Sequence, residues 1–596
     1  MTIRKAQVPA VRMASRRWLA CSLLVLLAVA GPALRAARKE TWLEVRSPHF
    51  IAYSEASEAE AREVLRGFEA MRSVFSVVLP GLQVDLHRPM IILVSRDAES
   101  MRRFVPRQFE GKDPKRPGGL FWQGQERNYA LVRMDVNLQD DQPFFVVFHE
   151  YTHCVVHQNF PELPAWFDEG IADFYGATQV RTKDVFLGRV PLGHLRTLQG
   201  VRMPLEGLLT VTRDSPYYQE GSKANIFYAQ SWALVHHLFL DEGARKAGLL
   251  GRFLQALERE PDALSAARAG FGDLKKLEND VARYATKSVF SFWNLPLKVA
   301  LTGADFQVRP VDEAEALAVR AEFLLYSDQL QAGAALAEQA KGLAPGQAAT
   351  QAAWGMACLR QGRYEEARGA LARALELGSQ DFRVPYHLAR LPQGSQADAG
   401  QVEAWLRRGL VLQPDFPDLH LALGRELAQR PEAQEPAVQE GLEAVKLSPS
   451  DLVLRLNFGS LLMSMGRIRE AEEVGRQAAQ MASSQRERDM LQSYQEHLAK
   501  LRDQLAARPV APSPAEPGGA LGPSAPLAVK GAKPLKFWLP DSLAALTGQV
   551  QIAILEGRLD DAIQMVQAAL PKAKGQYEKP SLKSLLQALK ARKAGH

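Results

Sequence analysis

Cysteine is scarce in this sequence, with three residues in a chain of 596. Such a count excludes a fold held by a disulfide framework, so packed apolar cores must stabilise the chain. Once an N-terminal segment described below is removed, only Cys154 and Cys358 remain. They lie in segments that we assign to different domains, so we expect no structural disulfide.

An excess of one charge is also missing once the N-terminus is set aside. Residues 1–36 contain six Lys or Arg and no Asp or Glu, so 67 of the 73 basic residues remain against 67 acidic ones. We therefore expect no nucleic-acid partner. Hydrophobic content of 46% and charged content of 23% are ordinary for globular protein, and the length predicts three or four domains.

Long apolar runs are confined to the N-terminus. A basic stretch ending at Arg17 precedes WLACSLLVLLAVAG, which has the length of a signal-peptide core and is short for a membrane span. Small residues permit cleavage after Ala30 or Ala36, and an uncleaved anchor is the alternative. The twin-arginine pattern fits poorly, and Cys21 is not placed like a lipoprotein cysteine. We predict a signal peptide at residues 1–36, bacterial export to the periplasm or beyond, and no stable membrane span after cleavage.

Residues after the signal mix strand-like and helix-like patterns. RPMIILVS and YALVRMD (129–135) favour strands, whereas SEAEAREVLRGFEAMRSVFSVVL has a helical period. Two helices flank FPELP, and further helices are predicted at 225–240 and 244–258. A mixed sheet followed by helices suits an α+β domain, which we place at residues 38–300.

Metal-capable side chains gather in FHEYTHCVVHQNFPELPAWFDEGIADFYG. His149 and His153 are four residues apart, so on a helix both imidazoles can reach one ion at about 2.0–2.1 Å. Glu150 points about 100° further round and can hold a water bound to that ion. Glu169 lies 16 residues after His153 on the next helix and completes three ligands, with a fourth position left open. Asp173, one turn further, can orient a ligating histidine.

These residues resemble the gluzincins, the thermolysin-like zinc peptidases, and LPAWFDEGIADFY looks like bacterial peptidase-MA-like domains. The resemblance covers about residues 41–300. It implies a zincin-type fold with one zinc ion held by His149, His153 and Glu169. It also implies that Glu150 acts as general base and then proton donor, and that YALVRMD is the edge strand to which a peptide adds.

The same resemblance implies a Tyr or His from a later helix that stabilises the transition state. Tyr228, expected in the first turn of its helix, is our candidate, since its phenol could donate to the oxyanion. The alternative is that Tyr228 packs in the core with its hydroxyl satisfied. Tyr217, Tyr218 and His236 are weaker candidates.

Other conspicuous groups in this region are given structural roles. His157 lies a turn too far along the helix to share the ion, so we interpret it as a neighbour of the site or a solvated side chain. A metzincin would carry a third histidine at Asn159, so that family does not fit. Cys154 is expected to fill core space, and Trp122 and Trp166 to form core or cleft wall.

Residues 311–503 have almost no strand signal and repeat at about 34–35 residues. GRYEEA (362–367) returns as GRIREA (466–471) and GRLDDA (557–562). Prolines and glycines recur at common spacings of 69 and 35, namely Pro345, Pro414 and Pro449, and Gly355, Gly424 and Gly459. This resembles the tetratricopeptide repeat, in which small residues let paired helices approach closely. We predict about five repeats.

The C-terminal part predicts a linker and one more helix pair. Residues 504–537 are rich in Pro, Ala and Gly, and residues 538–596 return to a repeat-like hairpin. The predicted fold class is therefore an α+β zincin-type metallopeptidase domain followed by an all-α tetratricopeptide-like solenoid.

The predicted function is an exported zinc-dependent metallopeptidase with a peptide or protein substrate and a protein partner bound through the repeats. One alternative is a catalytically silent scaffold that works through the repeats. Another is a zinc amide hydrolase acting on cell-wall peptide, and a third is a repeat adaptor with a chance motif.

Overall fold

The computed structural model describes residues 2–7, 41–110, 117–136, 143–160, 163–200, 202–219, 221–260, 262–297, 301–327, 329–391, 399–482, 485–506, 559–572 and 578–593. Two compact units separate at residue 508. The first holds two sheets and most of the helices, and the second holds two helices.

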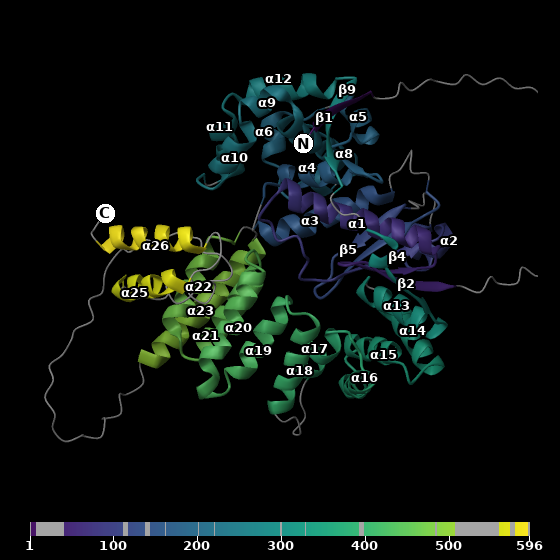
Figure 1. Ribbon diagram of the computed structural model, residues 1–596, viewed down its shortest axis with the longest axis vertical. Coiled ribbons are helices and arrows are strands. Elements are labelled where there is room, and N and C mark those ends of the chain that lie inside the picture. The colour runs from purple at the N-terminus through teal and green to yellow at the C-terminus, as the bar shows by residue number, and fades with distance from the viewer. Residues whose placement is uncertain are drawn as a thin grey trace, which may run out of the picture. The chain divides into compact units, whose positions relative to one another are not determined.

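A six-stranded mixed sheet forms the centre of the first unit (Figure 1). Its strand order is β10-β2-β3-β4-β6-β5, in which β3, β4 and β6 run parallel and the other pairs are antiparallel. MIILVS forms β4, and all six residues are buried, as expected for a central strand covered on both faces. The strands are β2 (Trp42–Arg46), β3 (Ile51–Ser54), β4 (Met90–Ser95), β5 (Gly119–Trp122), β6 (Asn128–Arg133) and β10 (Gln307–Val311).

Helices cover both faces of this sheet. On one face, α1 (Glu58–Val78) begins at a capping box of Ser57 and Glu60, and packs its apolar side beside α3 (Pro143–Asn159). On the other face, α2 (Ala98–Arg102) and α13 (Glu313–Tyr326) cover Leu93, Tyr129 and Leu131. The sheet is therefore buried between two helical layers.

The helices after the sheet pack around α4 (Ala165–Gly176), which lies between α3 and α8 (Gly221–Leu240). A Cβ on Gly170 would lie 2.5 Å from the Ser231 carbonyl oxygen, so only glycine lets α4 and α8 approach this closely. The smaller helices are α5 (Leu192–Leu198), α6 (Leu205–Leu209), α7 (Pro216–Gln219), α9 (Glu242–Lys246), α10 (Leu249–Leu257), α11 (Ala263–Phe271) and α12 (Leu274–Ala285).

A second sheet has the order β1-β9-β8-β7. Its strands are β1 (Thr2–Gln7), β7 (Gln179–Val180), β8 (Asp184–Leu187) and β9 (Val289–Pro296). Strand β1 falls inside the predicted signal peptide, where we expected no strand, and its removal would leave β9 as an edge. Residues 8–40, with the apolar run and both cleavage positions, lie outside the described residues.

Five antiparallel helix pairs follow the sheet domain, which confirms the predicted number of repeats. Gly355 packs against Leu371, and Gly424 faces the Ala437 carbonyl oxygen at 2.9 Å from its ideal Cβ, so the recurring glycines lie where paired helices meet. The pairs are α13 with α14 (Leu330–Leu343), α15 (Ala348–Arg360) with α16 (Tyr364–Glu376), α17 (Arg383–Arg390) with α18 (Ala399–Leu412), α19 (Pro417–Leu427) with α20 (Gln434–Leu447), and α21 (Leu452–Ser464) with α22 (Ile468–Ala479). Helix α23 (Gln485–Ala506) packs on the last pair.

The second unit contains α25 (Leu559–Ala569) and α26 (Glu578–Lys593), which pack through a small apolar core. This agrees with a C-terminal helix pair within residues 538–596. Most of the predicted linker at 504–537 lies outside the described residues. Among the described helices, none combines the length and apolar character needed to cross a membrane.

Four expectations need correction. YALVRMD is not an edge strand, because β6 lies between β4 and β5, and the edge is β5. The first domain extends past residue 300, because β10 completes its sheet by pairing with β2. The helix predicted at 244–258 is broken at Gly248, whose φ of 61° is left-handed. Helix α8 begins at Gly221, so Tyr228 lies in its third turn and not its first.

Candidate metal centre

The two helices that carry the metal-capable residues pack against each other. Helix α3 buries Val147, Tyr151 and Val155 toward the sheet, which turns the face with His149 and His153 toward α4. Gly176, at the end of α4, has its ideal Cβ position 3.2 Å from the His149 Cβ, so its lack of a side chain permits the close contact.

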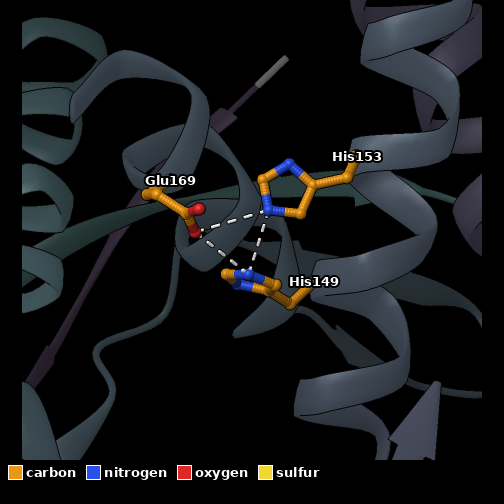
Figure 2. A group of neighbouring side chains, drawn as sticks. All are labelled: His149, His153 and Glu169. Atoms are coloured by element: carbon orange, nitrogen blue, oxygen red, sulfur yellow. Dashed lines mark hydrogen bonds and ion pairs between the residues drawn. The ribbon is translucent and has the colours of Figure 1, made fainter. Parts of the chain in front are cut away.

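Three donor atoms converge between these helices (Figure 2). The Nε2 atoms of His149 and His153 are 3.1 Å apart. One Glu169 oxygen, Oε2, lies 3.3 Å from the first and 3.4 Å from the second. Two imidazoles and one carboxylate on a common point are a donor set that suits zinc.

The Glu169 carboxylate has an atom whose burial calls for a partner. Its Oε2 is buried and has no hydrogen bond, although such an atom normally costs free energy when unsatisfied. The other oxygen accepts a hydrogen bond of 2.5 Å from the Tyr218 hydroxyl. The residues present therefore fit a cation at the convergence point.

Aspartates hold the opposite nitrogen of each imidazole. The Nδ1 of His149 lies 2.8 Å from Asp173, and the Nδ1 of His153 lies 3.0 Å from Asp168. Both carboxylates are 2% exposed. These contacts fix the ring orientation and leave each Nε2 for the ion, as carboxylate–histidine pairs do in zinc sites.

Each aspartate is itself held by a second cation or imidazole. His194 Nε2 lies 2.7 Å from Asp173, and the Arg213 guanidinium donates to Asp168 at 2.9 Å. His157 Nε2 also contacts Asp168 at 2.9 Å. His157 is thus next to the site, as predicted.

The electrostatics of the metal-free site reflect these contacts. Although burial would lower the pKa of His153, hydrogen bonds to Asp168 and Glu169 raise it to about 9. Burial would raise the pKa of Glu169, but both histidines lower it to about 2. Asp173 shows the same balance, since His194 and His149 lower its pKa despite burial. The site without an ion therefore holds its own protons as counter-charges, and metal would have to displace them.

The remaining predicted residues border the centre. The Glu150 carboxylate has no hydrogen-bonded or ionic partner in the described part of the chain, so it is free to hold a water molecule. The Tyr228 ring centroid lies 6.5 Å from that of His149 and 6.1 Å from that of Tyr218. Burial and the charge of Glu169 raise the pKa of Tyr228, which keeps its phenol protonated as a donor.

Several other candidates lie away from the centre. His236 is fully buried between the Tyr284 hydroxyl and the Gly188 carbonyl oxygen, and burial lowers its pKa to about 4. Tyr217 is exposed. Cys154 is a buried thiol, and Trp166 is a fully buried core residue.

The sequence analysis gave no role to Asp168, His194 or Arg213, and Tyr218 was only a weaker candidate. Asp168 could have been suspected, because it directly precedes Glu169 on α4. His194 and Arg213 lie on later segments with no spacing relation to the motif, so only the folded chain brings them to the site.

Comparison with protein families gives one match. The family described as "Protein of unknown function (DUF1570)" matches residues 146–261, which include both helices of the metal centre and α8. None of the curated proteins matches the chain.

Solved structures similar to the chain are repeat proteins. YrrB, described as a tetratricopeptide protein with an unusual peptide-binding site, is 18% identical, with a TM-score of 0.26 over 31% of this chain and 92% of its own. A thermophilic tetratricopeptide protein from Thermus thermophilus is 17% identical, with a TM-score of 0.25 over 32% and 98%. A tetratricopeptide repeat protein from Parabacteroides merdae is 13% identical, with a TM-score of 0.26 over 46% and 98%. The chain thus combines a helical-repeat part with a sheet domain that carries the candidate metal centre.

Proposed function

We propose that this protein is a zinc-dependent metallopeptidase in which His149, His153 and Glu169 hold the ion. The observation that carries the proposal is the convergence of three buried donor atoms, one of them a carboxylate oxygen with no hydrogen bond. The aspartate behind each imidazole supports it, because that arrangement leaves the Nε2 atoms for a cation.

The chain supplies the groups that peptide hydrolysis needs. When bound, zinc would polarise the scissile carbonyl and lower the pKa of a coordinated water towards about 7. Glu150, which is free of other partners, takes the proton of the attacking water and passes it to the leaving amine. Asp173 and Asp168 keep the two imidazoles oriented throughout.

Two tyrosines have separate roles in this proposal. Tyr218 donates to Glu169 and holds that carboxylate in place. Tyr228 lies beside the imidazole of His149 with a protonated phenol, and donates to the oxyanion that forms on the substrate carbonyl.

A binding scaffold is the second candidate function. The five helix pairs support it, since stacked helical repeats create extended surfaces that bind protein segments. In the combined proposal, the repeats bind a substrate or partner protein and the metal centre hydrolyses it. In the scaffold alternative, the repeats bind and the centre is silent.

Metal analysis of the purified full-length chain is the first test. We expect about one zinc per chain in the wild type and a large loss in Glu169→Ala. Glu376→Gln, which changes an exposed ion pair on α16, is the matched control and should retain the metal. Absence of zinc from the wild type after purification without chelator would contradict the proposal.

Turnover separates the enzyme from the scaffold. We expect hydrolysis of unfolded protein substrates that is lost in Glu150→Gln, while zinc content stays unchanged. A zinc-loaded wild type without hydrolysis would favour the scaffold. Parallel digestion of purified cell-wall material tests the remaining alternative, an amide hydrolase acting on wall peptide.

A further inference from the structure

The turn between β5 and β6 is bound by the first and third helix pairs of the repeats. The Glu126 carboxylate accepts a hydrogen bond of 2.8 Å from the Tyr326 hydroxyl on α13 and lies 3.0 Å from His387 Nε2 on α17. Gly124 packs against the same tyrosine, since its ideal Cβ position is 3.2 Å from the Tyr326 ring. The tip of this hairpin is therefore seated on the repeats.

A second set of contacts surrounds the next residue. Arg127 donates to Glu322 at 3.1 Å and lies 3.3 Å from Asp381. Arg383, whose side chain is fully buried, donates to the same Glu322 at 2.6 Å and pairs with Asp381. Two arginines thus share two carboxylates in a buried network, where loss of one member would leave another charge uncompensated.

The carboxylate of Glu126 is ionised under ordinary conditions. Burial alone would raise the pKa of Glu126, but the charges of His387 and Arg383 lower it to about 2. Its side chain is 15% exposed and that of His387 is 13% exposed, so solvent screens the contact only in part.

The seated hairpin contains the edge strand beside the metal centre. Strand β5 pairs only with β6 among the described strands, and it packs against α3, which carries His149 and His153. At the end of β5, Trp122 stacks edge-on against Phe323 of α13 with ring centroids 5.4 Å apart. A four-residue edge strand has few ladder hydrogen bonds of its own, so outside contacts decide how well it is ordered.

We infer that the repeats hold β5 in position through Glu126 and Arg127, and that these two are positioning residues for a substrate peptide that pairs with the β5 edge. The peptide-pairing part rests on the proposed peptidase function, whereas the anchoring of β5 does not. The repeats then act on the metal centre itself, because they fix the strand that borders it.

The test uses the full-length zinc-loaded protein with Glu126→Gln and His387→Gln, each alone and combined. Hydrogen exchange is followed at 119–122 in β5 and at 90–95 in β4 as an internal reference. The matched control is Glu376→Gln, which removes a charge from an exposed ion pair on α16.

We expect each single variant to speed exchange in β5 about tenfold, with no change in β4, because a charge-assisted hydrogen bond is lost locally. The combined variant should add little, since both changes remove one contact. For an unfolded peptide substrate, KM should rise several-fold while kcat and zinc content stay unchanged.

Unchanged β5 exchange in both single variants, or equal acceleration in β4, would overturn the anchoring. Faster β5 exchange with an unchanged KM would overturn the positioning role. If the wild type hydrolyses no peptide, the proposed function fails, and the exchange data still decide whether the repeats anchor β5.

Discussion

Replacement of Asp173 by asparagine tests the site through a residue that does not touch the ion. The side chain is 2% exposed and lies between His149 Nδ1 at 2.8 Å and His194 Nε2 at 2.7 Å. Asparagine keeps the shape but loses the charge, and its single acceptor oxygen cannot serve both rings.

The magnitude follows from the lost hydrogen bond. A hydrogen bond to a charged group contributes about 1.5–3 kcal/mol, and each 1.4 kcal/mol is about tenfold in an equilibrium constant. We therefore expect zinc affinity to fall about 10- to 100-fold, the range typical for residues that orient a ligating histidine.

A competition titration with a zinc-binding chromophore at fixed pH measures this change. Urea unfolding of the metal-free variant shows how much of it reflects folding. Asp280→Asn, which changes an exposed ion pair with Arg283, is the matched control and should leave zinc affinity unchanged. A normal affinity in a normally folded Asp173→Asn protein would refute the orienting role.

Three further outcomes are expected. In the metal-free protein, Asp168 helps raise the pKa of His153 to about 9 despite burial, so its stabilisation is complete below pH 6.5 and lost as pH rises through 9; urea unfolding should give about 2–3 kcal/mol less stability at pH 9.5 than at pH 6, and a flat profile would contradict this. Gly170→Ala should cost about 1–3 kcal/mol of unfolding free energy because its Cβ would lie 2.5 Å from a carbonyl oxygen in α8, whereas Gly193→Ala, which meets nothing within 4 Å, should not destabilise; equal effects would count against the packing argument. Tyr228→Phe should lower kcat for peptide hydrolysis about 100-fold or more with zinc content unchanged, and an unaltered kcat would assign the oxyanion to another donor.

The helix that carries His149 and His153 could be predicted because its signal is local. An apolar run with a helical period, and two histidines four residues apart, fix which side chains share a face before any tertiary contact forms. Glu169 was found on the same ground, since only one short loop separates its helix from the first. The five helix pairs were predictable for a related reason, because each pair contacts mainly its neighbours in sequence.

The edge strand could not be predicted in this way. YALVRMD has the alternation of a strand, but strand order depends on pairings between distant segments, and β5 with the sequence GLFW takes the outer place. Tyr228 was placed in the wrong turn of its helix because α8 begins earlier than the apolar pattern indicated. Helix ends depend on capping and packing that the pattern does not contain.

The sequence by itself determined which atoms can bind a metal, because ligand type and helical spacing are properties of a short segment. Only the tertiary structure decided what surrounds them. His194 and Arg213 come to the aspartates from later segments, and Arg383 reaches Glu322 and Asp381 from the repeats. Such contacts join residues far apart in the chain, and no local periodicity encodes them, since they arise when separately formed elements pack.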